Sequence, residues 1–502
     1  MPFCHLSAPN SGYIVPFYTN QHAHLKHQRG TNGLVHTYPC LLFIYNMPLG
    51  LESCPEPVVE CIAQLLDFDD IRNLRLTCKS LALKSSQYRF RTFFRSKHVN
   101  VTVDALRTFA EGIQAGGLRC LIQYLYLVGI VKECESRKPR KENYWQKEET
   151  RRMQVNLLSQ AFNGLAKYSK NGSLRLLTLR VAIVRNGEEM TLPADSGPLV
   201  PLQKSVWLCT MHTFDTVVSA LAASSLRINS LNIFSEPDMH CSSLECDQIN
   251  AIDWNDSGSA KTLATLRSLS ISLSTRVFAF RRALQENKQD VGRSSKKDAA
   301  EVQAEAGDEN DFIGLSGLLR LCNQLENLEI DYLRIPMGYS ALVGHFYYET
   351  ILQRIVELDR LPILKRCKFS GVSAKETDLL GFIQRTRVRE LSLEKVILCT
   401  GTFRSTFDYC TSRAASMTKL HFDTLYETLH DRHYVEKTIF FAGGGKSRIG
   451  FPSASATERL DREGESVRTS ITYYISPRTP IDNSWIPEWG RFRRAEDGRM
   501  IV

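Results

Sequence analysis

Short apolar segments recur along most of the chain, and in each one two apolar residues flank a single residue of another kind. The pairs are Leu125/Leu127, Leu177/Leu179, Leu231/Ile233, Leu269/Ile271, Leu328/Ile330, Cys367/Phe369, Leu391/Leu393 and Leu420/Phe422. Several of them have a further leucine three residues upstream: Leu174, Leu266, Leu325 and Leu364. This period of two is typical of strands that bury one face, so the pattern predicts a strand at each pair.

Between these segments the apolar residues change to helical spacing. The apolar faces are Leu157, Leu158, Ala161, Phe162 and Leu165; Phe214, Val217, Val218 and Leu221; and Leu379, Leu380 and Ile383. A strand–helix unit of this size cannot bury its own apolar face, so neighbouring units must stack on one another. The pattern therefore predicts an α/β (α+β) fold, with an irregular solenoid of repeats over residues 97–440.

The intervals between successive pairs indicate the kind of repeat. The last two intervals are 24 residues, from Cys367 to Leu391, and 29 residues, from Leu391 to Leu420. Both fit leucine-rich repeats, whose length is about 20–29 residues. The earlier intervals are longer, so they must contain insertions or degenerate units. Residues 132–152 are dense in Lys, Arg and Glu, and residues 287–311 contain almost nothing to bury; we expect the second to be a disordered insertion.

Residues 47–96 have a different pattern, which predicts three short helices. Apolar residues recur at helical spacing over 58–66, after Pro55 at a position suited to a helix start. Asp69 and Asp70 can cap a second helix, and Thr77 precedes a third that extends toward three phenylalanines at 90, 93 and 94. Three such helices bury little surface by themselves, so they need a partner or a neighbouring domain.

The two ends of the chain lack either pattern. Residues 1–46 are rich in His, Asn, Gly, Pro and Tyr, and we expect them to be disordered; a chain start at Met47 is the alternative. Residues 441–502 are expected to be a low-complexity linker, from Gly443 to Ser470, followed by a C-terminal tail.

Composition limits the class of protein. The hydrophobic fraction of 43% is ordinary for a globular chain, and the net charge of +9 is modest for 502 residues, so nucleic acid is not an expected partner. Most of the 14 cysteines stand singly in apolar runs and no CxxC occurs, which favours a reducing compartment, the cytoplasm or nucleus. No apolar run approaches the ~18 residues of a membrane span.

Several motifs with possible chemistry have simpler explanations. Lys446 follows three glycines as in a phosphate-binding loop, but Phe440 stands where that loop needs its first glycine. The histidines of residues 1–46, and His430 with His433, lack the fixed spacing of a zinc site. No catalytic constellation stands out, so we expect no enzyme activity, no metal and no cofactor.

Two basic stretches leave alternatives open. Residues 137–141 (RKPRK) could be a nuclear address, but the surrounding glutamates favour a solvated insertion. Residues 89–95 (RFRTFFR) alternate basic and aromatic residues like a nucleic-acid patch, although their spacing also suits a helix that packs on the first repeat.

The stretch LGLESCPEPVVECIAQLLDFDDIRNLRLTCKSLALKSS resembles the F-box, in particular that of fungal F-box proteins with leucine-rich repeats. The matching positions are Pro55-Glu56, Ile62 with Leu66-Asp67, Asp70-Ile71 and Arg75-Leu76-Thr77-Cys78-Lys79. Cys54 departs from the family, which usually has Leu at this position. The resemblance to the F-box covers about a tenth of the chain.

The resemblance implies a substrate-receptor subunit of an SCF-type ubiquitin ligase. The F-box would dock on the Skp-type adaptor and through it on the cullin–RING ligase, and the repeats would capture a protein target, whose identity the sequence does not give. Carried over by position, the adaptor-binding residues would be Pro55, Val58, Val59, Ile62, Leu66, Ile71 and Leu74, although some of these must form the core of the helices instead.

The residues expected to contact the target are the outward positions between or beside the apolar pairs. By alternation along each strand these are Arg180, Asn232, Ser270, Glu329, Lys368, Ser392 and His421. The alternative function is a repeat-domain interaction scaffold that acts outside a ubiquitin ligase, for example as a tether for RNA or a membrane.

Overall fold

The computed structural model describes residues 50–132, 144–169, 171–185, 188–190, 200–235, 242–250, 252–254, 257–274, 313–333, 350–429, 435–442 and 456–477. By its contacts the chain divides into Met1–Cys54 and Pro55–Val502, and of the first unit only residues 50–54, with the short 3-10 helix η1 (Leu51–Ser53), are described. The expected disorder of 1–46 and 287–311, the basic run 137–141, the glycines before Lys446 and both His430 and His433 lie outside the described residues.

Four short helices follow Pro55, one more than the pattern predicts: α1 (Glu56–Leu65), α2 (Phe68–Thr77), α3 (Lys79–Lys84) and α4 (Tyr88–Thr92). The cap of α2 is Asp67, whose carboxylate accepts a hydrogen bond from the Asp70 backbone N–H at 2.8 Å. The prediction that Asp69 and Asp70 cap this helix was therefore wrong, because both lie inside its first turn. There their negative charge interacts favourably with the positive end of the helix dipole.

The interior of these helices is small. Ala63, Ile71 and Phe90 form its buried cluster, and Phe93 and Phe94 pack against it. Phe90 and Phe94 lie in edge-to-face contact, with ring centroids 5.0 Å apart. The aromatic residues of the 89–95 stretch thus contribute to helix packing.

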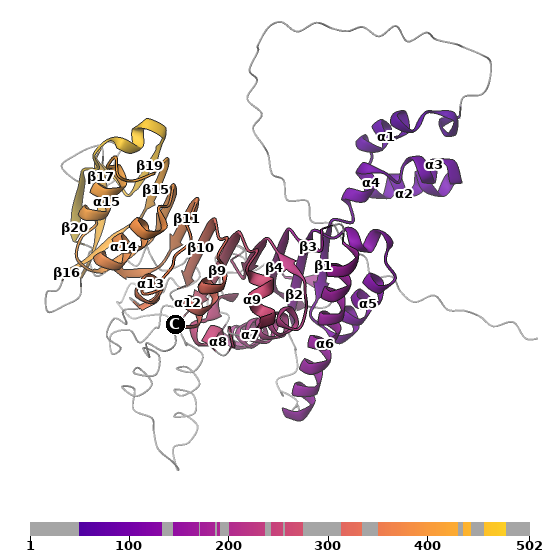
Figure 1. The fold of residues 1–502 in the computed structure, drawn as a ribbon, viewed down its shortest axis with the longest axis horizontal. Helices are drawn as coiled ribbons and strands as arrows, with labels where there is room; N and C mark the ends of the chain where they lie inside the picture. Colours follow the sequence, from indigo (N-terminus) through magenta and orange to yellow (C-terminus); the bar gives the residue numbers. More distant parts are fainter. Residues whose placement is uncertain are drawn as a thin grey trace, which may run out of the picture. The chain divides into compact units, whose positions relative to one another are not determined.

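Within the described residues twelve strands form one sheet (Figure 1). Its main path is, in order, β1 (Ser96–Asn100), β2 (Tyr124–Lys132), β4 (Leu176–Arg185), β7 (Ser230–Ile233), β9 (Ser268–Ser274), β10 (Asn327–Leu333), β11 (Arg366–Ser370), β13 (Glu390–Glu394), β15 (Lys419–Asp423) and β19 (Arg459–Glu463). The short strands β5 (Glu188–Glu189) and β8 (Leu244–Glu245) pair with β4 and β9. Neighbours from β1 to β15 are parallel and β19 is antiparallel to β15, which confirms a mixed α/β fold with a mostly parallel sheet.

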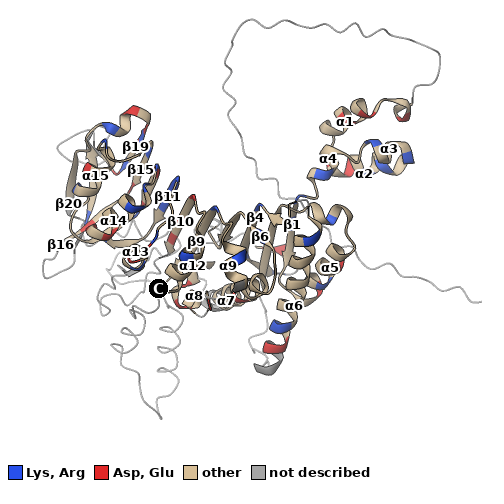
Figure 2. Ribbon diagram, in the orientation of Figure 1, with Lys and Arg blue, Asp and Glu red and all other residues tan. Residues whose placement is uncertain are grey.

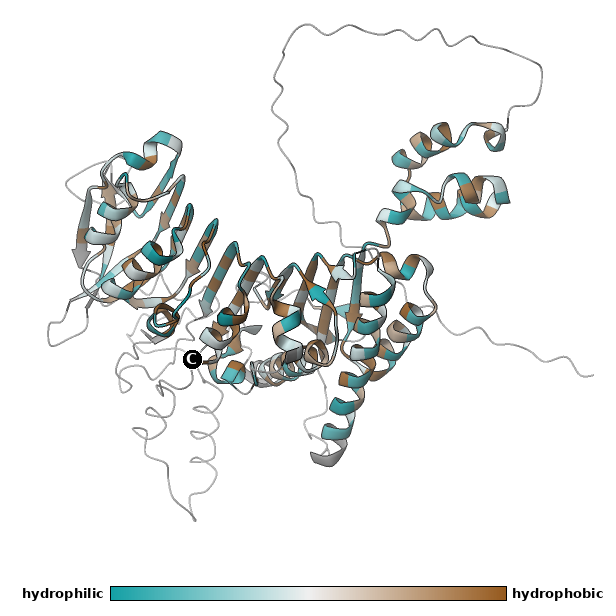
Figure 3. Cartoon of the chain, in the orientation of Figure 1, coloured by the Kyte–Doolittle hydropathy of each residue, from teal (hydrophilic) through white to brown (hydrophobic). Residues whose placement is uncertain are grey.

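The apolar pairs expected from the sequence all lie in strands of this sheet, and they stand opposite one another. Leu125 is in register with Leu177, and the row continues through Leu231, Leu269, Leu328, Cys367, Leu391 and Leu420. The second member of each pair forms a parallel row that ends at Phe422. Both rows are buried, as are the upstream leucines, and Figure 3 shows the resulting alternation of hydrophobic and hydrophilic residues along the strands.

Helices connect the strands and pack on the sheet (Figure 1). They are α5 (Val103–Gln114), α6 (Tyr144–Tyr168), α7 (Val200–Ala222), α8 (Cys246–Asn250), α9 (Ser257–Leu263), α12 (Ile313–Leu321), α13 (Thr350–Val356), α14 (Glu376–Thr386) and α15 (Arg404–Thr411), with the 3-10 helix η2 (Gly117–Leu121) after α5. Their apolar faces are buried at Phe162, Phe214, Phe382 and Phe407. Part of the charge-rich segment 132–152 belongs to α6, which begins at Tyr144.

Tight turns lead from three of the strands into a second sheet. Its strands are β12 (Ser373–Lys375), β14 (Ile397–Thr400), β16 (Tyr426–Leu429), β17 (Val435–Ala442), β18 (Ala456–Thr457) and β20 (Tyr473–Pro477), and β3 (Ser173–Leu174) pairs separately with β6 (Arg227–Ile228). Gly371, Lys395 and Thr424 make the turns, with φ of 68°, 54° and 54°. Each of these residues donates its backbone N–H to a backbone carbonyl at the near end of the neighbouring strand. The acceptors are Glu394 for Gly371, Asp423 for Lys395 and Glu458 for Thr424, so the three units repeat one hydrogen-bond pattern.

The segment after residue 440 contains regular structure. The expected boundary at 440/441 falls inside β17, and β18, β19, the 3-10 helix η5 (Gly464–Arg468) and β20 occupy residues expected to form the linker and tail. Phe441 on β17 and Val467 in η5 are buried in the main core. Among the described helices, none has the length and apolar character needed to cross a membrane.

Candidate functional site

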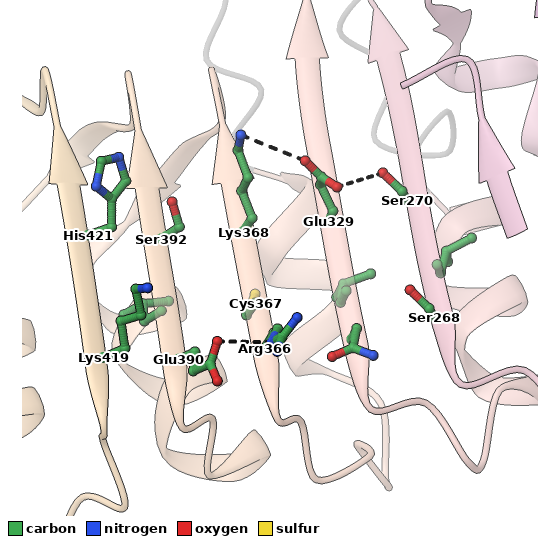
Figure 4. Close-up of a pocket in the computed structure, with 14 residues that line it drawn as sticks. Ser268, Ser270, Glu329, Arg366, Cys367, Lys368, Glu390, Ser392, Lys419 and His421 are labelled. Atoms are coloured by element: carbon green, nitrogen blue, oxygen red, sulfur yellow. Dashed lines mark hydrogen bonds and ion pairs between the residues drawn. The ribbon is translucent and has the colours of Figure 1, made fainter. Parts of the chain in front are cut away.

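One residue from each strand of the main path forms a continuous row between the two buried apolar rows, and of these residues Thr178 on β4 is itself buried. This outward row consists of His98, Tyr126, Thr178, Asn232, Ser270, Glu329, Lys368, Ser392, His421 and Asp461. Because side chains alternate along a strand, the row lies on the face of the sheet opposite the buried pairs, which we call the open face. Figure 4 shows five of its members side by side on five neighbouring strands.

The structure brings six of the seven expected target-binding residues into the outward row: Asn232, Ser270, Glu329, Lys368, Ser392 and His421. Arg180 lies two residues farther along β4, where its register partner is Val128, and Thr178 takes its place in the row. Arg180 forms an ion pair with Glu189 of β5. The sequence also gave no reason to include His98 and Asp461, since neither β1 nor β19 contains the apolar pair that marked the other strands.

Polar contacts link the row on its N-terminal side. The backbone N–H of Ser235 donates to Asn232 Oδ1 at 3.1 Å, and Ser235 Oγ lies 2.6 Å from Ser270 Oγ. Ser270 Oγ in turn donates to Glu329 Oε2 at 2.8 Å (Figure 4). These contacts hold the side chains of β7, β9 and β10 in one arrangement.

Lys368, on β11, links the neighbouring strands β10 and β13 by contacting a carboxylate on each. Its ammonium lies 3.7 Å from Glu329 Oε1 and 3.0 Å from Glu394 Oε1. Ser392 Oγ donates to the same Glu394 oxygen at 3.2 Å. Burial alone would lower the pKa of Lys368, but the hydrogen bond to Glu394 and the charges of Glu394, Glu329 and Asp331 outweigh it and raise the pKa above 10.5. Lys368 therefore stays charged at neutral pH.

His421 and Asp461 are the last two members of the row. Its Nδ1 lies 2.6 Å from Asp461 Oδ1, and its Nε2 lies 3.7 Å from Glu394 Oε1. Arg459 contacts the second oxygen of Asp461 at 2.6 Å. The hydrogen bond from Arg459, helped by that from His421, lowers the pKa of Asp461 below its usual 3.8. The antiparallel strand β19 is thus joined to β15 by side chains as well as by its backbone.

The open face is hollowed over β9 to β15. The hollow has a volume of about 460 Å³, and its polar lining comes from the outward row and from the positions two residues earlier: Ser268, Ser270, Asn327, Glu329, Arg366, Lys368, Glu390, Ser392, Lys419 and His421. In this lining Arg366 and Glu390, on the neighbouring strands β11 and β13, form an ion pair at 2.9 Å. Figure 2 shows acidic and basic residues on neighbouring strands here, so side chains of both charge signs are available to pair with a polar ligand.

The other end of the outward row is aromatic. The rings of His98 and Tyr126 stack with centroids 4.3 Å apart and planes 2° apart. Burial, with the positive charges of Arg180 and Lys97, lowers the pKa of His98 below 6.5, so the imidazole is neutral at pH 7. The two ends of the row therefore differ in chemistry.

The residues expected to bind the adaptor divide by burial. Val59 and Ile71 are fully buried and form part of the helical interior, whereas Pro55 and Val58 are exposed and Ile62, Leu66 and Leu74 are half-buried. Large apolar side chains outside the expected set are more exposed: Leu65 at 87%, Leu76 at 75% and Leu83 at 72%. The resemblance to the F-box did not identify these three leucines, because a match of sequence positions does not show which side of each helix faces the interior.

The part of the chain that the structure describes contains no group of three or more His, Cys, Asp or Glu side chains placed to hold a metal ion. No protein-family model matches the chain, and neither does any curated protein.

Proposed function

We propose that this chain is the substrate-receptor subunit of an SCF-type ubiquitin ligase, in which residues 47–96 are an F-box that docks on the Skp-type adaptor. The observation that carries the proposal is the exposure of Leu65, Leu76 and Leu83 on three short consecutive helices. Largely exposed leucines on consecutive short helices are typical anchors for a partner helix or groove. They fall within the segment whose sequence resembles the F-box.

The sheet provides the second half of the proposal, a repeat domain that captures the target. The units of 24 and 29 residues that start at Cys367 and Leu391 have the same strand, turn and helix, which fits a leucine-rich-repeat solenoid. In such a solenoid the strand face is the binding surface. We assign target binding to the open face, with Glu329, Lys368, Ser392 and His421 at its centre.

The chain would contribute no chemistry of its own to ubiquitin transfer. By holding a target and the ligase in one complex, it would raise the effective concentration of the acceptor lysine near the ubiquitin-loaded enzyme.

Co-purification of the full chain with a Skp-type adaptor tests the adaptor assignment. The variant combines Leu65→Asp, Leu76→Asp and Leu83→Asp; the control is Ile363→Asp, an apolar residue of similar exposure, 63%, outside the four helices. We expect the triple variant to lose the adaptor and the control to retain it, with circular dichroism unchanged in both. Equal recovery of the adaptor with the triple variant contradicts the assignment. A wild-type chain that captures a protein target but never the adaptor would instead be a scaffold outside a ligase.

A further inference from the structure

A second outward line of side chains, one step beyond the outward row, is rich in carboxylates. This upper row contains Asp331 on β10, Ser370 on β11, Glu394 on β13 and Asp423 on β15, which stand in direct register. Because each lies two residues after a member of the outward row, all four share the open face.

The cations nearest to these carboxylates, Lys368 and Arg459, are already engaged, and Arg459 stands in register with Asp423 while it forms an ion pair with Asp461. Lys368 contacts both Glu329 and Glu394, and Ser392 and His421 approach the same Glu394 oxygen. Among the described residues neither Asp331 nor Asp423 has an ion-pair partner within 4 Å, and Asp423 accepts only the hydroxyl of the adjacent Thr424. The carboxylates of the two rows over β10–β19 thus share two permanent cations, Lys368 and Arg459, on a chain whose net charge is +9; these carboxylates are Glu329, Asp331, Glu394, Asp423 and Asp461.

We propose that the upper row over β10–β15 binds an extended, arginine- or lysine-rich segment of the target protein. The inference rests on the proposed function, since it names the class of target that the open face would capture. The strand pairing fixes the backbones of these half-exposed carboxylates, and arginine offers them paired N–H donors. The mixed charges below the row favour a polar chain over an apolar helix.

The spacing of the carboxylates suits an extended chain that crosses the strands. Asp331 and Asp423 stand three strand separations apart, or roughly 14 Å. Residues four positions apart in an extended peptide are also roughly 13–14 Å apart. Two basic residues with this spacing could therefore meet Asp331 and Asp423 at the same time, with Glu394 between them.

Fluorescence anisotropy with the full chain tests the inference directly. The probe is a labelled peptide with two arginines four positions apart in an uncharged Gly/Ser/Ala background, and its counterpart has two glutamates. We expect the arginine peptide to bind at low salt and to weaken as salt rises. The double variant Asp331→Asn/Asp423→Asn should weaken binding about tenfold. The control Glu111→Gln/Asp408→Asn removes the same charge from exposed helical positions and should leave binding unchanged.

The variant Lys368→Gln should change the affinity for the arginine peptide in the direction opposite to that of the double variant. Removing the cation that competes for Glu394 should tighten binding of the arginine peptide, whereas general damage to the sheet would weaken it. Equal affinity of wild type and the double variant, preference for the glutamate peptide, or weaker binding by Lys368→Gln each overturns the inference. So does a dimer of the chain that the double variant dissociates, because a second copy would then be the occupant. Adaptor co-purification, measured on the same variants, should be unaffected, so failure of the F-box assignment is distinguishable.

Discussion

The carboxylate of Glu427, on β16, accepts a hydrogen bond from the backbone N–H of Phe403 at 2.7 Å, although only 3% of Glu427 is exposed. The same oxygen accepts the hydroxyl of Tyr473, on β20, at 3.0 Å. Glu376, at the start of α14, accepts the neighbouring N–H of Thr402 at 2.8 Å. Two carboxylates from different repeat units thus hold the loop that starts α15 and join it to the C-terminal strand.

Replacements of Glu427 should separate its role as an acceptor from its charge. Glu427→Gln keeps an oxygen for Phe403 and Tyr473, so we expect no loss of stability. Glu427→Leu leaves both donors unpaired in the interior and should cost about 1–3 kcal/mol. Urea unfolding of both variants at pH 7 measures the difference; an equal loss in the two variants would show that the charge itself is needed.

The buried carboxyl of Glu427 also predicts that the stability of the chain depends on pH. Burial raises the pKa of Glu427 above 4.5, and the hydrogen bonds from Phe403 and Tyr473 offset this only in part. The folded state therefore holds this proton more tightly than the unfolded state, and stability falls as the pH rises from 4.5 through the raised pKa. Relative to wild type, Glu427→Gln should gain stability over that interval and show no gain below it. A difference that stays constant with pH contradicts the buried-charge explanation.

Ile71 and Leu76 should respond very differently to truncation, although both lie on α2. Ile71 is fully buried beside Ala63 and Phe90, so Ile71→Ala should cost the helical segment about 2–5 kcal/mol. Leu76 is 75% exposed, and Leu76→Ala should change stability by less than about 0.5 kcal/mol. Hydrogen exchange of α1–α4 in the full chain reports each effect, and comparable loss of protection in both variants would refute this assignment of core and surface.

Two of the turns into the second sheet predict that glycine is the favoured residue, so a substitution that introduces glycine and one that removes it should have opposite effects on stability. Thr424 adopts a φ of 54°, which is costly for a β-branched residue, so Thr424→Gly should stabilise the chain by up to about 1 kcal/mol. At the equivalent position Gly371, an added Cβ would overlap the Tyr332 carbonyl oxygen, and Gly371→Ala should destabilise by more than about 1 kcal/mol. The urea midpoints of the two variants should move in opposite directions; a shared direction contradicts the equivalence of the turns.

The period-two pattern was sufficient to find the strands of the repeat and the inward side of each. Pairs such as Leu391/Leu393 face the core, and Ser392 between them faces out, because alternation is a local property of any strand. The same locality explains why six of the expected target-binding residues stand in one row without any knowledge of the strand order.

Strand pairing was decided by the tertiary structure alone. β1 and β19 lack the apolar pair, and β19 joins β15 from 40 residues away, as the contact of His421 with Asp461 shows. Arg180 was misplaced for another reason, because Thr178 lies between the paired leucines of β4 and the sequence already shows this. Register depends on which residues of a neighbouring strand complete the buried layer, and no local pattern contains that information.

The sequence by itself determined the mixed α/β architecture, the buried layer and the outward positions, because these follow from side-chain periodicity within single elements. Only the tertiary structure decided which apolar residues of α1–α3 stay exposed and how the charges of Glu329, Lys368 and Glu394 are shared. Both depend on neighbours that are distant in sequence. Val58 and Val59 are adjacent and alike in chemistry, yet one is exposed and the other buried, because packing against the other helices selects one side of α1.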